Sequence, residues 1–150
     1  MRAIKSSRSL DIAFSSTETL FTFIQDALLE SDMDCRVLLR NPEAGNSRLQ
    51  AKLLDYEERW KQVGITNKRF RVQVRYCNNT AFRLLILNKD EVYFGFYRVE
   101  GSRLRGHTEP MFHVKPGSTV SDYLLLIALN RFEASWNAGS EIIGERPSLV

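Results

Sequence analysis

Apolar residues along the chain follow two spacings, one typical of strands and the other typical of helices. Short apolar runs occupy 10–16 and 34–42, and the second run ends at a proline. Runs of this length bounded by polar residues predict buried strands. A capping-box pattern at 15–18 and another at 47–50 each precede apolar residues spaced three or four positions apart. These two segments are therefore predicted to be helices.

The second helix and the last helix carry the clearest apolar stripes. The stripe of the second helix consists of Leu49, Leu53, Tyr56, Trp60 and Val63. Gly64 follows it and suits a C-terminal cap. The last helix is predicted at 119–138, with a stripe formed by Leu125, Leu129, Phe132 and Trp136. Both stripes are interpreted as faces packed on the core.

Three further strands and a short one precede the last helix. Residues 70–76 alternate strictly between apolar and polar, which predicts a strand with one exposed face. Residues 82–88 are almost wholly apolar and predict a central strand, which a tight turn joins to a hairpin partner at 92–99. A loop at 100–110 then leads to a short strand at 111–114. This order of elements predicts an α/β fold, with a mixed β-sheet flanked by helices.

The composition indicates which kinds of site and location are expected for this chain. A length of 150 residues and a hydrophobic content of 43% fit one domain spanning 1–150. Cys35 and Cys77 lie in apolar runs without metal-binding spacing, so we expect buried free thiols, no metal and no cofactor. No apolar run approaches the roughly 20 residues of a membrane span, and the first residues lack the apolar core of a signal peptide. A cytoplasmic location is therefore expected, and the net charge of +3 permits an anionic partner without demanding one.

One predicted strand carries a family resemblance. The stretch "AFRLLILNKDEVYFGFYR", residues 81–98, resembles the strand that bears the His-x-Lys-x-x-x-x-Asp signature of the phospholipase D superfamily. In this alignment Ala81 stands at the histidine position, Arg83 at the lysine, Asn88 at the aspartate and Gly95 at the glycine that follows.

The resemblance covers about 9–138 and implies a single phospholipase D-like half domain without its catalytic chemistry. The family's histidine attacks phosphorus, and the methyl group of Ala81 has no lone pair with which to do so. The chain is therefore expected not to be an enzyme. Residual phosphodiesterase activity through His107 or His113 is the least favoured hypothesis.

The remaining motif positions suggest a place where an anion could bind. Arg83 stands where the family's lysine holds a phosphate oxygen, and a guanidinium can make that contact with two N–H groups. The candidate ligand-binding residues are Arg83, Asn88, Arg98, Glu109 and His113. The alternative is that Arg83 is a partly buried arginine paired with a carboxylate such as that of Glu109.

A second stretch, "HVKPGSTVSD" at 113–122, spells a similar motif in the wrong register. The family's aspartate lies five residues after its lysine, whereas Asp122 lies seven residues after Lys115. Pro116 and Gly117 also mark a turn immediately after the lysine. His113 is therefore expected on a short strand before the last helix, beside the vestigial site.

Three functions are open for such a domain. The first is a non-catalytic sensor or binding module for a phosphate-bearing ligand, a partner or effector subunit in a regulatory or defence-type bacterial system. Family members with one half per chain pair their sites across a two-fold axis, so the resemblance also implies a homodimer. The second function is nucleic-acid binding through an arginine-rich strand and loop, with candidate contacts at Arg71, Arg75, Arg103 and Arg105. The third is a structural dimerisation domain whose pocket is filled by its own side chains.

Overall fold

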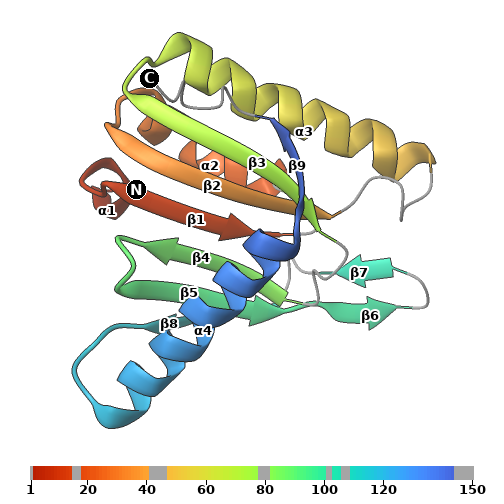
Figure 1. The fold of residues 1–150 in the computed structure, drawn as a ribbon. Helices are drawn as coiled ribbons and strands as arrows, with labels where there is room; N and C mark the ends of the chain where they lie inside the picture. Colours follow the sequence, from red (N-terminus) through yellow and green to blue (C-terminus); the bar gives the residue numbers. More distant parts are fainter. Residues whose placement is uncertain are drawn as a thin grey trace.

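The protein is built around a seven-stranded mixed β-sheet that carries helices on both faces (Figure 1). The computed structural model describes residues 2–14, 18–40, 47–77, 82–100, 103–105 and 109–143. The strand order is β8-β5-β4-β1-β2-β3-β9. The strands are β1 (Ser9–Ala13), β2 (Met33–Arg40), β3 (Phe70–Cys77), β4 (Phe82–Leu87), β5 (Glu91–Phe96), β8 (Phe112–Val114) and β9 (Ser140–Ile143). The predicted α/β architecture with a mixed sheet is confirmed.

Parallel and antiparallel pairings divide the sheet according to how its strands are connected. β1 pairs in parallel with β2, and β2 pairs in parallel with β3. Parallel neighbours need a crossover connection, and here α2 (Glu18–Leu29) and α3 (Ser47–Thr66) provide it. β4 pairs antiparallel with β1, and β5 and β8 extend the sheet antiparallel on that side. β9 closes the other edge antiparallel to β3.

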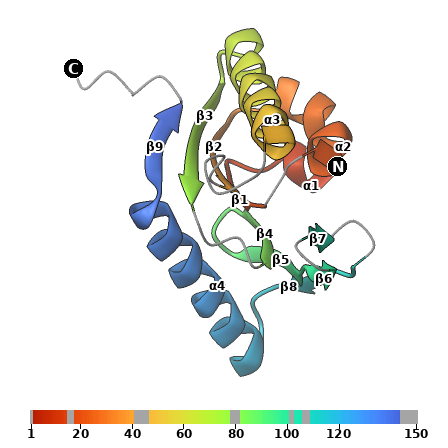
Figure 2. The same cartoon turned by 90° about the vertical axis from the view of Figure 1, so that its right-hand side faces the viewer.

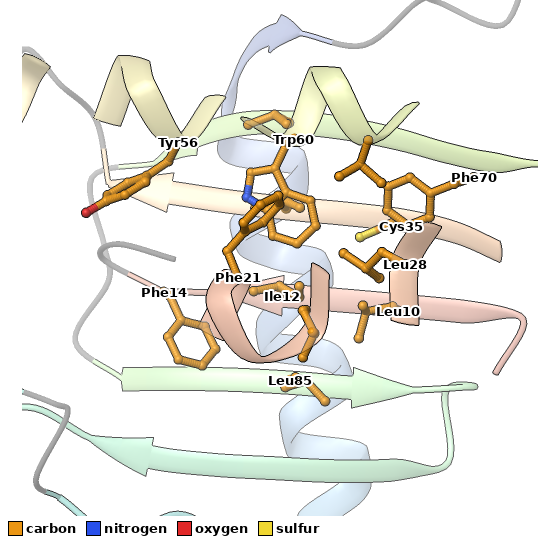
Figure 3. Packing of buried hydrophobic residues seen from close by; sticks show 14 of the residues in the cluster. Leu10, Ile12, Phe14, Phe21, Leu28, Cys35, Tyr56, Trp60, Phe70 and Leu85 are labelled. Atoms are coloured by element: carbon orange, nitrogen blue, oxygen red, sulfur yellow. The ribbon is translucent and has the colours of Figure 1, made fainter. Parts of the chain in front are cut away.

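The larger core lies between the sheet and the helices α2 and α3 (Figure 2). A short helix, α1 (Arg2–Lys5), packs against α2 on the same side. Phe21 of α2 meets Trp60 of α3 edge-to-face, with ring centroids 5.0 Å apart (Figure 3). All described members of the predicted α3 stripe are buried: Leu53, Tyr56, Trp60 and Val63. The side chain of Leu49 lies outside the described part of the chain. Cys35 and Cys77 are buried free thiols, as expected.

The predicted cap at Gly64 is wrong, because α3 continues to Thr66. A Cβ at Gly64 would lie 3.2 Å from the Cγ1 of Val72, so the glycine allows the helix to approach β3 closely. Asn67 follows the helix and donates a side-chain hydrogen bond of 2.9 Å to the carbonyl of Leu28. The end of α3 is thus tied to the end of α2 by an asparagine side chain.

The second core lies on the opposite face, under α4 (Thr119–Ala138), whose bounds match the prediction (Figure 2). Ser118 caps its first turn, with Oγ accepting a hydrogen bond of 3.1 Å from the Ser121 N–H. Leu125, Phe132 and Trp136 are buried against the sheet. In the described ranges, no helix combines the length and apolar character needed to cross a bilayer.

Two short features escaped the sequence prediction. β6 (Arg98–Glu100) and β7 (Arg103–Arg105) pair antiparallel as a separate two-stranded sheet, where a loop and a longer strand were expected. β9 follows α4 and was not expected at all. Strands of three or four residues are too short to show a reliable alternation. The first predicted capping box falls largely outside the described residues, because 15–17 are not described and α2 begins at Glu18.

Candidate anion-binding site

Arg83 is a buried cation held by backbone carbonyl groups. It lies near the start of β4, and 6% of its surface is exposed. Its Nη2 donates to the carbonyl oxygens of Glu109 at 2.8 Å and Pro110 at 3.1 Å. Among the described residues, its Nε has no hydrogen-bond partner. The site therefore contains a buried N–H donor that another group could use.

Gly95 makes room for this guanidinium. Arg83 and Gly95 are register partners in the β4–β5 pair. A Cβ on Gly95 would lie 2.7 Å from the Nη2 of Arg83 and 2.7 Å from the carbonyl oxygen of Pro110. Both distances are well inside van der Waals contact, so the arginine crosses the neighbouring strand only because position 95 lacks a side chain.

The alternative expectation, an ion pair between Arg83 and the Glu109 carboxylate, is wrong about the group that makes the contact. Glu109 does contact Arg83, but through its backbone carbonyl. The Glu109 carboxylate instead lies 3.4 Å from the Nε of Arg98, whose Nη2 also pairs with Glu100 at 2.9 Å. In the part of the chain that the structure describes, no carboxylate forms an ion pair with Arg83. Arg83, Arg98 and Glu109 thus lie together, and no described carboxylate balances the positive charge of Arg83.

Asn88 lies at the other end of β4 and does not belong to this group. It follows Arg83 by five positions along the strand, which corresponds to about 17 Å. Asn88 opens the β4–β5 turn with φ of 52°. Its Oδ1 accepts from the Arg8 N–H at 2.8 Å, and its Nδ2 donates to the Ser7 hydroxyl at 3.3 Å. The prediction that Arg83 and Asn88 share one ligand site is therefore wrong. Asn88 instead forms hydrogen bonds with the segment that precedes β1.

His113 forms a third, separate group at the edge strand β8. Its ring stacks on its register partner Tyr93, with centroids 4.2 Å apart and planes inclined by 3°. Its Nε2 lies 2.6 Å from the Oε1 of Glu91, which also accepts from the Tyr93 hydroxyl at 3.0 Å. Although partial burial opposes its charge, hydrogen bonds from His113 and Tyr93 hold the pKa of Glu91 below its ordinary value. His113 is on a short strand before α4, as expected, and its ring contacts Tyr93 and Glu91.

Comparison with known proteins agrees with this geometry at the level of the fold. No protein-family model and no curated protein matches the chain. Among solved structures, it is similar to a phospholipase D family member, Nuc from Salmonella typhimurium. The TM-score is 0.56 at 13% sequence identity, over 94% of this chain and 86% of that one. The chain has a phospholipase D-like fold.

Several of the predicted positions fall outside the described residues. Ala81, at the histidine position, directly precedes the described start of β4, and His107 lies in an undescribed stretch. Arg103 and Arg105 are on β7, and their side chains are not described. No cluster of three or more metal-binding side chains occurs in the described ranges.

The other two candidate nucleic-acid contacts have partners within the protein. Arg71 is exposed on β3 and its Nε lies 2.5 Å from the Asp34 carboxylate. Arg75 donates from Nη1 to the Trp136 carbonyl at 2.7 Å, and its guanidinium lies 4.4 Å from the centroid of the Trp136 ring. Arg75 therefore secures the end of α4, whereas Arg71 faces solvent with its charge paired.

Sequence reasoning missed a buried ionic network under α4. Arg36 forms two hydrogen bonds with the buried Asp11, at 2.7 and 2.9 Å, and reaches Glu133 of α4 at 2.5 Å. Lys89 also contacts Asp11. Although burial disfavours its charge, hydrogen bonds from Asp11 and Glu133 raise the pKa of Arg36. The available signal was a charged residue flanked by apolar ones in each of the two runs: Asp11 in 10–16 and Arg36 in 34–42.

Proposed function

We propose that this chain is a non-catalytic phospholipase D-like binding module that holds a phosphate-bearing ligand through Arg83, assisted by Arg98. The observation that carries the proposal is that no carboxylate among the described residues pairs with Arg83. Arg83 is 6% exposed, and its described contacts are backbone carbonyl oxygens and the ring of Tyr97, whose centroid lies 5.9 Å from the guanidinium carbon. Taking a charge out of water costs several kcal/mol unless an opposite charge or hydrogen bonds offset the loss. A bound anion would supply an opposite charge and would accept a hydrogen bond from the Nε of Arg83.

Arg98 gives the ligand a second cation at the surface. Its side chain is 56% exposed and its contact with Glu109 is long, at 3.4 Å. Exposed pairs of this kind contribute about 0–1 kcal/mol, so a phosphate oxygen can replace the carboxylate at small cost. Glu109 links the two arginines, because its carbonyl contacts Arg83 and its carboxylate contacts Arg98. Loss of the Arg98–Glu109 contact on binding would loosen the segment of Glu109 and Pro110, whose carbonyl groups contact Arg83.

We expect no catalysis, because the motif lacks its nucleophile. Ala81 offers no nucleophile at the histidine position. His113 does not replace it, since its Nε2 is within hydrogen-bond distance of Glu91 and its ring stacks on Tyr93. We expect no phosphodiesterase activity towards generic diester substrates. Hydrolysis that disappears when His113 is replaced by alanine would contradict this part of the proposal.

Calorimetric titration with inorganic phosphate, nucleotides and short oligonucleotides tests the binding. We expect Arg98→Gln to weaken binding about tenfold, because a hydrogen bond to a charged group contributes about 1.5–3 kcal/mol. Arg83→Lys should weaken it further, since lysine keeps the charge without the planar fork. The matched control is Arg59→Gln on α3, which removes another exposed arginine paired with a carboxylate, Asp55 at 2.9 Å.

Two outcomes favour the other functions. Binding of oligonucleotides alone, weakened by Arg71→Gln and steeply dependent on salt, would favour nucleic-acid recognition along β3. The internal partners of Arg71 and Arg75 give that function less support. No heat and no thermal shift with any of these ligands would favour a structural domain with a filled pocket, for which the carbonyl contacts of Arg83 already provide an argument.

A further inference from the structure

Helix α4 has two apolar faces, and only one of them is covered by described residues. Leu125, Phe132 and Trp136 are buried against the sheet. In the first half of the same helix, five other large apolar side chains are 37–69% exposed: Val120, Tyr123, Leu124, Leu126 and Ile127. A helix that is apolar all round is normally covered all round. We therefore expect another apolar surface to pack against the second face of α4.

The exposed residues form a stripe along the helix. Val120, Tyr123 and Ile127 follow the spacing i, i+3, i+7, which places them on one side of a helix. At about 100° per residue, they lie roughly opposite Leu125 and thus point away from the sheet. The stripe ends one turn after Ile127, where Asn130 and Arg131 follow. A stripe with this period is suited to packing against another helix.

The sheet adds two aromatic rings on the same side. Phe94 packs on the core under α4, and its ring contacts Phe96 at 6.2 Å and Phe112 at 5.3 Å between centroids. Phe96 is 62% exposed and Phe112 is 52% exposed. Phe112 belongs to β8, the edge strand, which contacts α4. We call these two rings together with the five exposed α4 side chains the outer apolar face.

The outer apolar face is large for a protein that stays monomeric. The five α4 residues expose on the order of 550 Å², at the upper end of the roughly 300–600 Å² that the largest patch of a monomer covers. With Phe96 and Phe112 the total is roughly 800 Å², which is about the area that each partner buries in a standard interface. None of the seven side chains is charged.

We propose that the outer apolar face is the interface between two copies of this chain. A two-fold axis near Ile127 would place each stripe against its own copy, so that an uncharged face meets a second uncharged face of equal size. Arg83 is two residues before Leu85 on β4, so both side chains lie on the same face of the sheet. Leu85 belongs to the core under α2 and α3. The interface therefore lies on the sheet face opposite to Arg83. Such a dimer leaves both Arg83 sites outside the contact, unlike a dimer that pairs its sites across the axis.

Sedimentation velocity over a range of protein concentrations tests the interface. The wild-type chain is expected to sediment as a dimer, and Ile127→Glu and Tyr123→Glu as monomers with unchanged circular dichroism. The matched controls are Phe23→Glu on α2 and Ile65→Glu on α3, whose side chains are 67% and 56% exposed elsewhere on the protein. Both controls should remain dimers. A wild-type monomer at the highest soluble concentration, or a dimer that survives Ile127→Glu, would overturn the proposal.

A cross-linking experiment gives an independent readout of the same contact. Cys35 and Cys77 are buried, so a new surface cysteine is the accessible thiol among the described residues. Ile127→Cys should give a covalent dimer under mild oxidation, whereas Ile65→Cys should not. Equal cross-linking of both variants would indicate random collision and count against the interface. Phosphate titration of the Ile127→Glu monomer separates the two proposals, because anion binding at Arg83 should persist in it.

Discussion

The guanidinium of Arg83 occupies the space that a side chain on Gly95 would fill. The two residues are register partners on β4 and β5, and a Cβ at position 95 would lie 2.7 Å from the arginine Nη2. Gly95→Ala should therefore displace the arginine or the strand and destabilise the fold by about 1–3 kcal/mol. Urea unfolding measures the change. An exposed apolar residue outside the outer apolar face provides the control, since Phe23→Ala on α2, where the side chain is 67% exposed, is expected to change stability by about 0.5 kcal/mol or less.

The ionic network under α4 predicts unequal effects for its two carboxylates. Asp11 is 2% exposed and accepts hydrogen bonds from Arg36, so Asp11→Asn leaves a half-buried cation without the charge of its main partner. We expect a loss of about 3 kcal/mol in the free energy of unfolding. Glu133→Gln removes a carboxylate that is 48% exposed, and should cost less than about 1 kcal/mol. Equal losses in the two variants would contradict the assignment of Asp11 as the central anion.

Stability should also fall in acid through Glu133 and Glu91. The hydrogen bond from Arg36 holds the pKa of Glu133 below the ordinary value of 4.5, and that of Glu91 is lowered as well. A depressed carboxyl pKa contributes stability that is fully present above the unfolded-state pKa, and the contribution is lost as pH falls through the folded-state pKa. The urea midpoint of the wild type should therefore decline below pH 4.5. The decline should be shallower in Glu133→Gln, and an unchanged slope would argue against the Arg36 contact.

The turn residue Asn88 should tolerate aspartate but not alanine. Its φ of 52° is unfavourable for most side chains, and its Oδ1 accepts a hydrogen bond from the Arg8 N–H. Asn88→Asp keeps an acceptor there and should be nearly neutral. Asn88→Ala loses it and should destabilise the fold by about 1–2 kcal/mol. Thermal unfolding distinguishes the two, and neither variant should alter phosphate binding, because Asn88 lies at the far end of β4 from Arg83.

The helices and the central strands were predictable because their apolar patterns are long. The bounds of α4 agree with the prediction, and the α3 stripe is buried as expected. The sequence spacing of Arg83 and Gly95 was informative, because the β4–β5 hairpin places these two residues opposite each other. The spacing of Arg83 and Asn88 did not, since both lie on one strand at opposite ends. The Arg36 network depends on α4 crossing the sheet, and no local pattern encodes that crossing.

Helix α4 and β9 also determine when the fold can be completed during synthesis. The helix contacts β8 at one edge of the sheet, and the strand that follows it pairs with β3 at the other edge. Until residue 143 has left the ribosome, β3 has no antiparallel neighbour on its outer side and the second core lacks its cover. The nascent chain therefore exposes an open sheet edge and an apolar sheet face together. In that interval it depends most on protection from aggregation.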